Sequence, residues 1–410
     1  MALSSLIESV LGVDLPIAFR AYDGSALGPA EAPATLVLRS PDALRRIITA
    51  PGELGFARAY VSGDLDVEGD IFEALSLRDR LPDVRLSPRQ FLAAVREVGL
   101  RNLRGLPPPP EEARLRGRRH SVARDRAAVR HHYDVSNDFY RLVLGPSLTY
   151  SCAVFTSDDT TLEQAQANKY ELVARKLDLH EGMRLLDVGC GWGGMVLHAA
   201  QNHGARAVGI TIAERQCDLA SKRAADAGLI DSVEIRNQDY RLTDDGPYDA
   251  ISSIGMFEHV GEDRLADYFR SLFDLLAPGG RMLNHGISRP PGASARFERN
   301  SFIDHYVFPD GELHEVGRVV SIMQQAGFEV RHVESLREHY AKTLRHWVAN
   351  LEDNWDEAVQ LVGPARARIW RLYMAGSALN FEANRSQIHQ VLGVKPANGS
   401  SAMPWRPDWK

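Results

Sequence analysis

The chain has 410 residues, of which 44% are hydrophobic, so its length predicts two domains with large apolar cores. Its formal net charge of −6 gives no reason to expect a nucleic acid partner. The three cysteines (Cys152, Cys190 and Cys217) lie too far apart for a zinc site and argue against a disulfide framework. The first residues lack the pattern of a signal peptide, and no apolar run is long enough to span a bilayer. We therefore expect a cytoplasmic protein that is at most peripheral to the membrane.

The N-terminal part predicts a small α+β domain over residues 1–100. A strand is expected from Thr35 to Arg39, and helices are expected from Pro41 to Thr49 and from Gly55 to Val61, before a turn at Ser62. Its polar residues form no legible chemical cluster, so this part of the sequence predicts a fold and no activity.

A segment rich in arginine and proline follows and predicts a domain boundary over residues 101–128. Nine arginines crowd around the Pro107 to Pro110 run: Arg101, Arg104, Arg114, Arg116, Arg118, Arg119, Arg124, Arg126 and Arg130. One interpretation is a solvated linker. The other is a basic face for anionic phospholipid headgroups.

Strands and helices alternate from Gly182 onward, which predicts an α/β fold with a doubly wound sheet. The expected strands are 184–188, 206–210, 233–236, 248–254, 281–287, 329–335 and 387–392. The expected helices are 195–202, 214–227, 264–276, 313–325, 340–361 and 364–382, with a loop insertion over 289–311.

A glycine-rich turn follows the first of these strands and predicts the site of a nucleotide-like cofactor. Asp187-Val-Gly-Cys-Gly-Trp-Gly193 leaves no side chains at Gly189, Gly191 and Gly193, where the chain must turn sharply at a strand's carboxyl end. Such a turn also occurs in NAD, FAD and nucleotide loops, or simply as a tight turn. The second strand ends in Thr211-Ile212 and lacks the carboxylate that dinucleotide folds place there. The D-x-G-x-G-x-G form resembles the first motif of class I S-adenosylmethionine methyltransferases.

Five further motifs carry a more specific resemblance. They are His131-His-Tyr-Asp-Val-Ser-Asn-Asp-Phe-Tyr140, Leu148-Thr-Tyr-Ser-Cys-Ala-Val-Phe155, Gly255-Met-Phe-Glu-His-Val260, Asn284-His-Gly-Ile287 and His339-Tyr-Ala-Lys-Thr-Leu-Arg-His-Trp347. Together with the glycine-rich turn, the sequence from about Val129 resembles the cyclopropane fatty acid synthase family, which includes the mycolic acid methyltransferases. The resemblance implies a class I methyltransferase domain over 129–410 with a Rossmann-like seven-stranded sheet and helical insertions.

The resemblance also implies which residues bind S-adenosylmethionine. The expected cofactor residues are Tyr150, Ser151, Asp187, Gly189, Gly191, Gly193, Thr211, Ile212, Gln216, Asp239 and Tyr240. His131, Tyr133 and Tyr140 are expected to line the acyl entrance, although a packing role suits them nearly as well. No metal is expected.

Methyl transfer to a cis alkene creates a carbocation, which requires a dry pocket and a base. The family resolves this with a bound bicarbonate ion, and the resemblance implies the site Cys152, Glu258, His285, Ile287 and Tyr340. Taken singly, Cys152 is typical of a small buried hydrophobe, His285 of a core histidine, and Glu258 of a helix cap. The five residues together at family positions favour the anion site.

The expected function is methyl transfer to the cis double bond of an unsaturated acyl chain in membrane phospholipid. Residues 17–24 and 133–140 resemble most closely the actinobacterial members that make 10-methylene fatty acids, the precursors of 10-methylstearate. The alternative product is a cyclopropane on the same substrate. The implied partners are a second copy of the chain in a homodimer and a flavin-dependent reductase that acts on the product. The N-terminal domain is expected to serve lipid docking or dimerisation.

Three other functions remain as alternatives: a small-molecule O- or N-methyltransferase, a nonenzymatic lipid-binding protein, and a nicotinamide oxidoreductase. The first would not need the predicted anion site. The second would not need an intact glycine-rich turn or intact anion ligands. The third would fail to bind S-adenosylhomocysteine.

Overall fold

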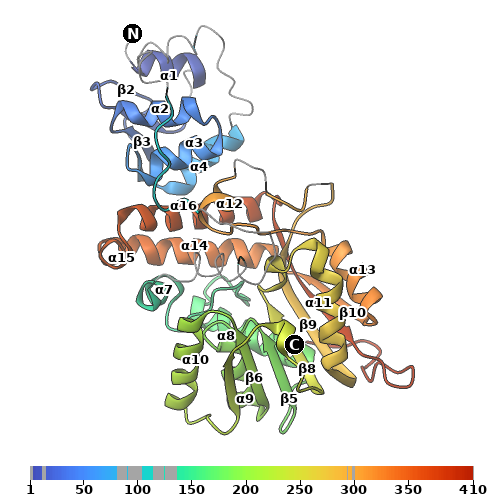
Figure 1. Ribbon diagram of the computed structural model, residues 1–410. Coiled ribbons are helices and arrows are strands. Elements are labelled where there is room, and N and C mark those ends of the chain that lie inside the picture. Colours follow the sequence, from blue (N-terminus) through green and yellow to red (C-terminus); the bar gives the residue numbers. More distant parts are fainter. Residues whose placement is uncertain are drawn as a thin grey trace. The chain divides into compact units, whose positions relative to one another are not determined.

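The computed structural model describes residues 3–11, 15–80, 90, 104–113, 124, 136–292, 294–297 and 301–409. The contacts divide the chain into two compact units (Figure 1). The smaller unit consists of Met1–Arg114, Glu298–Pro309 and Leu351–Leu379. The larger unit consists of Leu115–Phe297, Asp310–Asn350 and Asn380–Lys410. The sequence predicts domains that are contiguous along the chain, whereas these contacts group two later segments with the N-terminal residues.

The smaller unit contains a four-stranded sheet with the order β2-β1-β3-β4. β1 pairs with β3 in parallel, and the other two pairings are antiparallel. Helix α2 begins at Pro41 because the Ser40 side chain accepts a hydrogen bond from the Asp42 amide. The elements are α1 (Leu3–Leu11), β1 (Ala18–Ala21), β2 (Ala26–Leu27), β3 (Ala34–Leu38), α2 (Pro41–Thr49), α3 (Glu53–Val61), β4 (Leu65–Gly69), α4 (Ile71–Arg80), α12 (Phe302–Tyr306), α15 (Trp355–Val362) and most of α16 (Pro364–Glu382).

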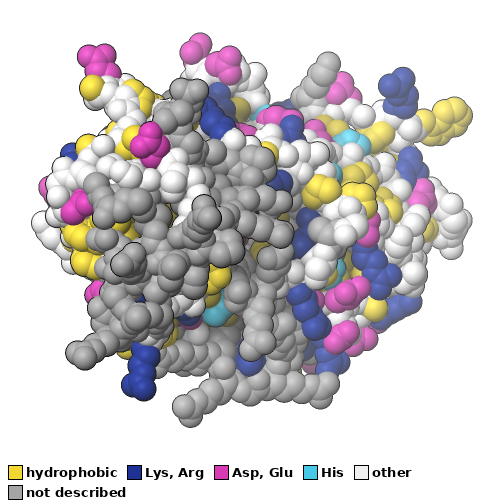
Figure 2. Space-filling view, turned by 90° about the horizontal axis from the view of Figure 1, so that it is seen from above, with side chains coloured by type: hydrophobic (Ala, Val, Ile, Leu, Met, Phe, Trp, Pro, Cys, Tyr) yellow, Lys and Arg dark blue, Asp and Glu magenta, His cyan; other side chains and the backbone are white. Residues whose placement is uncertain are grey.

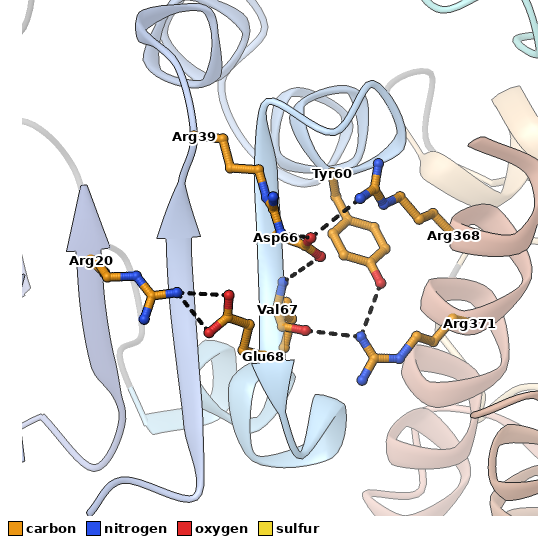
Figure 3. Close-up of polar contacts among 8 residues, drawn as sticks. All are labelled: Arg20, Arg39, Tyr60, Asp66, Val67, Glu68, Arg368 and Arg371. Carbon is orange, nitrogen blue, oxygen red and sulfur yellow. Dashed lines mark hydrogen bonds and ion pairs between the residues drawn. The ribbon is translucent and has the colours of Figure 1, made fainter. Parts of the chain in front are cut away.

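Two arginines of α16 bind residues near the start of the chain (Figure 3). Arg371 donates to the carbonyl oxygen of Val67 (3.1 Å) and to the hydroxyl of Tyr60 (3.2 Å). Arg368 forms an ion pair with Asp66 at 3.2 Å. Guanidinium donors thus satisfy polar groups along β4 and α3, and this explains why residues 351–379 belong to the smaller unit.

A buried carboxylate holds the segment 298–309 in the same unit. Glu112 accepts hydrogen bonds from the Arg58 guanidinium (2.7 and 2.9 Å) and lies 2.9 Å from Nδ1 of His305. Burial opposes the charged form, but hydrogen bonds from His305 and Arg58 outweigh it and lower the pKa of Glu112 to about 2. The Ala113 amide also donates to the His305 carbonyl oxygen (2.8 Å).

The larger unit contains a seven-stranded sheet with the order β10-β11-β9-β8-β5-β6-β7, in which β11 is antiparallel to both neighbours. The predicted α/β doubly wound sheet is therefore confirmed. Its strands are β5 (Arg184–Val188), β6 (Arg206–Thr211), β7 (Val233–Asn237), β8 (Tyr248–Ile254), β9 (Leu276–Ser288), β10 (Glu329–Ser335) and β11 (Gln387–Val394). Its helices are α7 (Asn137–Leu144), α8 (Leu162–Leu177), α9 (Gly194–His203), α10 (Glu214–Asp226), α11 (Glu262–Leu275), α13 (Val316–Ala326) and α14 (Arg337–Asp353), with short 3-10 turns η2 (Tyr240–Leu242) and η3 (Phe257–His259).

Helices cover both faces of this sheet, because successive strand residues point to opposite sides. Leu185 packs in a core with residues of α8 and α9, whereas Leu186 and Val188 pack in a second core with residues of α11 and α13. The carboxyl ends of the parallel strands meet at one edge of the sheet, which is where doubly wound folds bind ligands.

Several elements differ from the sequence prediction. Helices α1, α4, α7, α8 and α12 and strands β1, β2 and β4 have no predicted counterpart, and α12 lies in the stretch expected as a loop insertion. The stretch expected as one helix from Tyr340 to Leu361 forms two helices, α14 and α15, since Asn354 leaves the helical conformation (φ −118°, ψ 32°). β9 begins at Leu276, five residues before the predicted Arg281, because Leu276 already pairs with Tyr248 of β8. Just past the end of β11, the Gly279 amide donates to the Lys395 carbonyl oxygen (2.7 Å) and the Lys395 amide donates to the Gly280 carbonyl oxygen (3.0 Å).

Most of the arginine-rich segment lies outside the described residues. Of its nine arginines the structure describes Arg104 and Arg124, and Arg124 donates to Asp310 (2.9 Å). On the described part of the face in Figure 2, basic and acidic side chains are interspersed. The phospholipid-facing interpretation of this segment therefore stays a prediction. Among the described helices, none combines the length and apolar character needed to cross a membrane.

Figure 3 shows two arginines that differ in exposure: the Arg371 side chain is 11% exposed and the Arg20 side chain is 54% exposed. We expect Arg371→Ala to lower the free energy of unfolding by about 2 kcal/mol, because the carbonyl oxygens of Val67 and Gly69 lose a charged donor. Arg20→Ala is the control, because its ion pair joins side chains that are 54% and 47% exposed, and we expect a loss below about 1 kcal/mol. Urea denaturation measures both values, and equal losses would contradict the assignment.

Candidate active site

The glycine-rich turn connects β5 to α9 and has the backbone conformation that requires glycine. Gly189, Gly191 and Gly193 have φ angles of 80°, 54° and 82°, in the left-handed region that other residues rarely adopt. The amides of Gly189 and Cys190 lie 3.0 Å from the carbonyl oxygen of Ile210, which fixes the turn to β6. Among the described residues, no atom lies within 4 Å of a Cβ added at Gly191, so this side of the turn leaves room for a ligand.

The predicted ribose contacts lie at the carboxyl end of β6. The Thr211 hydroxyl donates to Oε1 of Gln216 (3.0 Å), and both residues are buried. Ile212 is partly exposed beside them, and Glu214, the nearest carboxylate on α10, is exposed. The strand end therefore presents hydroxyl and amide groups and not the carboxylate of a dinucleotide fold.

The predicted adenine contacts follow β7. Asp239 caps η2 and accepts hydrogen bonds from the amide (3.0 Å) and the guanidinium (2.7 Å) of Arg241. The Tyr240 ring packs edge-on against Tyr268, with ring centroids 4.9 Å apart. The Tyr268 hydroxyl is held by Ser253 at 2.7 Å, so the Tyr240 ring rests on a rigid support.

Four aromatic side chains form a cluster, which we call the aromatic cluster: Tyr140, Tyr150, Trp192 and Trp347. Tyr140 on α7 is fully buried, 4.7 Å from the Trp192 ring and 6.0 Å from the Tyr150 ring. Tyr150 also stacks on Trp347 of α14 at 5.3 Å. The structure therefore groups a predicted entrance residue, Tyr140, with a predicted cofactor residue, Tyr150. His131 and Tyr133, the other two predicted entrance residues, lie outside the described residues.

Helix α8 fixes the segment that carries Tyr150, Ser151 and Cys152. Gln166 donates to the carbonyl oxygen of Ser151 (2.9 Å), and Lys169 donates to the Ser151 hydroxyl (3.0 Å). One residue on, the Tyr170 hydroxyl lies 2.8 Å from the hydroxyl of Thr149. Gln166 and Lys169 are functional neighbours that the sequence did not predict. The sequence signal that could have identified them is their position, because both are polar residues on the apolar stripe of an amphipathic helix.

Lys169 and Asp187 are two buried groups of opposite charge next to the glycine-rich turn. Burial lowers the pKa of Lys169 to about 7 and raises the pKa of Asp187 to about 6, and each charge partly offsets the shift of the other. Ser252 donates to Asp187 at 2.6 Å, and the Lys169 ammonium lies 3.7 Å above the Tyr170 ring. These two groups therefore ionise in the neutral pH range.

Glu258 lies on η3, at the carboxyl end of β8. Its Oε1 accepts a hydrogen bond from the Ile287 amide (2.7 Å), and its Oε2 has no partner among the described residues. Burial raises the pKa of Glu258 to about 7. The Ile287 amide, predicted to hold the anion directly, donates here to the carboxylate. Gly286 lets η3 pack on β9, because a Cβ there would lie 1.9 Å from the Phe257 ring.

A chain of hydrogen bonds fixes the tautomer of His285. The Lys176 ammonium donates to Oε1 of Gln390 (2.7 Å) and pairs with Glu334. Because an ammonium group accepts no hydrogen bond, Gln390 presents its oxygen to Lys176 and its NH₂ group to Nδ1 of His285 (3.0 Å). Nδ1 is then an acceptor, so Nε2 carries the proton. Burial lowers the pKa of His285 well below its usual value, which keeps the ring neutral.

Hydrogen bonds to the backbone of Leu336 hold Cys152 and Tyr340 near this site. The Cys152 thiol lies 3.7 Å from the Leu336 carbonyl oxygen, which also accepts the Tyr340 amide (3.1 Å). The Leu336 amide donates to Ile388, which pairs with Ile287 across β11 and β9. Burial raises the pKa of the Cys152 thiol, so this group stays neutral. The fold thus brings Cys152, Tyr340, Glu258 and His285 to one end of the sheet.

The buried atoms without a hydrogen-bond partner among the described residues include the Nε2–H of His285 and Oε2 of Glu258. A buried donor or acceptor left unsatisfied costs about 1–3 kcal/mol. A ligand that accepts one hydrogen bond and donates another would satisfy both groups. Bicarbonate has acceptor oxygens and one hydroxyl, so the residues present fit this ion.

The order of the seven strands, with β11 antiparallel, and the glycine-rich turn after β5 define a class I S-adenosylmethionine-dependent methyltransferase. Residues 120–391 match the family model described as mycolic acid cyclopropane synthetase, and the chain belongs to this family.

Two full-length relatives are named as enzymes of fatty acids. The chain is 48% identical to a probable fatty acid methyltransferase of Mycobacterium tuberculosis over 407 residues, which cover 96% of this chain and 95% of the relative. It is 40% identical to a probable fatty acid methyltransferase of Pseudomonas putida over 413 residues, which cover 98% of each chain. The chain is therefore an S-adenosylmethionine-dependent methyltransferase of the fatty acid methyltransferase and cyclopropane synthase family.

The solved structure of mycolic acid cyclopropane synthase CmaA1 complexed with SAH and CTAB resembles the chain at a TM-score of 0.62 and 35% identity. The matched region covers 65% of this chain and 97% of the CmaA1 chain. The alignments with the two fatty acid methyltransferases cover 96% or more of the chain, so they include most of residues 1–119, which the family model leaves out.

The hydrogen-bond chain behind His285 makes a prediction for NMR. In a ¹⁵N-histidine-labelled chain, we expect His285 to be neutral with its proton on Nε2 between pH 6 and pH 8, as its lowered pKa implies. Gln390→Met should abolish this tautomer preference and lower the free energy of unfolding by about 1–3 kcal/mol, because Lys176 loses a buried acceptor.

The spectrum of a His285→Gln chain assigns the signal, and the signal of His389, which hydrogen-bonds Ser288 at 2.7 Å, is the internal control. A proton on Nδ1 of His285 in the wild-type chain would refute the arrangement.

Proposed function

We propose that this methyltransferase transfers a methyl group to the cis double bond of an unsaturated acyl chain in membrane phospholipid. The observation that carries the proposal is the pair of unsatisfied buried atoms, His285 Nε2 and Glu258 Oε2. A methylated alkene is a carbocation that must lose a carbon-bound proton inside a dry site, which calls for a buried proton acceptor. An O- or N-methyltransferase does not need this arrangement. The names of the two full-length relatives support a fatty acyl substrate.

When bound, S-adenosylmethionine supplies an electrophilic methyl group on a positively charged sulfur. In this proposal, the glycine-rich turn with Tyr150 and Ser151 holds its methionine half, Thr211, Ile212 and Gln216 contact the ribose, and Asp239 and Tyr240 contact the adenine. Lys169 fixes the Ser151 hydroxyl by a hydrogen bond. Because the pKa of Lys169 is about 7, part of the Lys169 side chains are neutral, and Lys169 does not place a permanent second positive charge beside the sulfonium. Repulsion between lysine and sulfonium is thereby reduced.

Bound bicarbonate would supply the base that takes the proton. His285 donates from Nε2 and orients the oxygen that receives this hydrogen bond. Glu258 offers Oε2 as the acceptor of the next proton, while the Ile287 amide on Oε1 stabilises the charged carboxylate. A carboxyl with a pKa of about 7 accepts a proton and releases it near neutral pH with similar ease. Cys152 and Tyr340 complete the enclosure of this site.

The proposed product is a 10-methylene branched chain, the precursor of 10-methylstearate. It forms when a hydride moves from the methylated carbon to the neighbouring cationic carbon and the new methyl group then loses a proton, which leaves a C=CH₂ branch. Direct loss of a proton from the new methyl group would instead close a cyclopropane, which is the second candidate. Two observations support the branched product. The sequences of residues 17–24 and 133–140 resemble those of the members that form 10-methylene fatty acids, and the chain is similar to fatty acid methyltransferases over nearly its full length.

The proposal includes partners that suit this chemistry. The smaller unit would dock on the bilayer or bind a second copy of the chain. A flavin-dependent reductase would act on the methylene product. The enzyme would work at the cytoplasmic face of the membrane, where its phospholipid substrate lies.

The product can be identified in cells that express the chain and are supplied with oleate. We expect phospholipid fatty acids to gain one methylene unit, detected by mass spectrometry, together with exocyclic vinylidene protons in the NMR spectrum. High-field cyclopropane protons with the same mass gain would show the alternative product. A glycine-turn variant, Gly191→Asp, is the inactive control. No mass gain with the wild-type chain would refute the acyl substrate and favour a small-molecule methyltransferase.

Glu258 makes a prediction for the pH dependence of turnover. Because the proton acceptor must be ionised, kcat should fall about tenfold per pH unit below pH 7, the range of its raised pKa. Glu258→Gln should bind S-adenosylhomocysteine normally, lose most turnover and lack this acid limb.

The matched control is Glu262→Gln, four residues on, where the side chain is 49% exposed and turnover should not change. Bicarbonate is kept at one concentration at each pH, and added bicarbonate should stimulate enzyme depleted of it. Near-normal turnover of Glu258→Gln would remove this residue from the mechanism.

A further inference from the structure

A second cluster of ionisable side chains lies between α8 and α9, and the proposed reaction does not use it. Nε2 of His198 lies 3.2 Å, and Nε2 of His203 lies 3.0 Å, from the same oxygen of Glu171, Oε2. The two imidazole rings are 5.6 Å apart between centroids, and the three ligand atoms all lie within 4.8 Å of one another. Two nitrogens and one oxygen therefore lie close enough together to share one ion.

This donor set has the composition and the spacing of a transition-metal site. Two histidines and one carboxylate are the protein ligands of a common class of zinc site, which leaves a fourth position to water. Bonds of about 2.0–2.1 Å at tetrahedral angles place neighbouring ligand atoms about 3.3 Å apart. The observed separations of 3.0 and 3.2 Å are close to this value. The side chains are 13%, 18% and 33% exposed, so an ion and a water molecule can reach them.

Groups around the cluster suit metal binding. The Asn202 amide lies 3.0 Å from Nδ1 of His198. The NH₂ group of Asn202 faces Nδ1, so Nε2 carries the proton that faces Glu171. Metal binding requires the Asn202 amide to rotate, so that its oxygen accepts the proton on Nδ1 and the Nε2 lone pair faces the metal. Arg175 donates to Oε1 of Glu171 (2.7 Å), which orients the carboxylate so that Oε2 faces the histidines. The positive charge of Arg175 opposes a cation, so the affinity should be moderate.

We propose that Glu171, His198 and His203 bind a divalent transition-metal ion, with Zn²⁺ as the expected ion. The bound ion would link α8 to α9. Both helices support the glycine-rich turn: α9 begins at Gly194, and Tyr170, next to Glu171, packs on the His198 ring at 5.9 Å and holds Thr149. The bound ion therefore acts as a structural link behind the cofactor site. This inference does not depend on the proposed substrate.

Metal titration of the untagged, chelator-treated chain tests the proposal. We expect one Zn²⁺ ion to bind per chain in competition with a chromogenic chelator and to raise the thermal unfolding midpoint. His198→Gln and His203→Gln should each weaken binding at least about tenfold and abolish the rise in the midpoint. His180→Gln is the control, because this exposed histidine contacts a backbone carbonyl oxygen and lies outside the cluster, and its chain should bind Zn²⁺ as the wild type does.

A second variant predicts a gain. Asn202→Asp should tighten binding about tenfold, because a carboxylate on Nδ1 makes His198 a stronger ligand. Co²⁺ serves as the spectroscopic probe, and we expect the intense visible absorption of a tetrahedral site. No saturable Zn²⁺ binding by the wild-type chain, or equal binding by the His198 and His203 variants, would overturn the proposal and leave a hydrogen-bonded cluster without metal.

Discussion

The desolvation of charged groups at the carboxyl ends of β5, β8 and β9 governs the chemistry of this site. Lys169, Asp187 and Glu258 are almost fully buried, and burial brings all three pKa values into the neutral range. Each group retains one fixed hydrogen bond: Lys169 to Ser151, Asp187 to Ser252, and Glu258 to the Ile287 amide. The fold thus supplies enough stabilisation to keep these groups inside and leaves them able to exchange protons.

The antiparallel strand β11 is part of the site as well as of the sheet. Its register places Gln390 opposite His285, and the side chain of Lys176 on α8 reaches Gln390 from the neighbouring layer. A parallel strand in another register would present a different residue to the histidine. The chemical state of His285 therefore depends on sheet topology. Removing β11 alone would remove the tautomer control even with every predicted anion ligand still present.

The fold could be predicted from the sequence because its signals are local. Alternating strands and helices, and glycines at three left-handed positions, specify the doubly wound sheet and the turn. Glu258 and His285 could be singled out only by family resemblance, since a lone carboxylate or histidine after a strand has ordinary structural explanations. Gln166, Lys169 and Lys176 were missed. Their spacing places them on the apolar stripe of α8, but the spacing does not identify the groups they bind, and only the tertiary contacts do.

Under the proposed reaction, acid–base groups alone do not decide between the methylene and the cyclopropane product. Both routes end in proton loss to the same acceptor, so Glu258 and His285 serve either one. The routes differ in whether a hydride moves from the methylated carbon to the cationic carbon before the new methyl group loses its proton, and the way the acyl chain is held selects between them. Tyr140 and Trp347 of the aromatic cluster are fully buried and packed against Tyr150, so they form a rigid wall next to the predicted cofactor residues. We therefore expect product choice to depend on the shape of this wall rather than on the strength of the base.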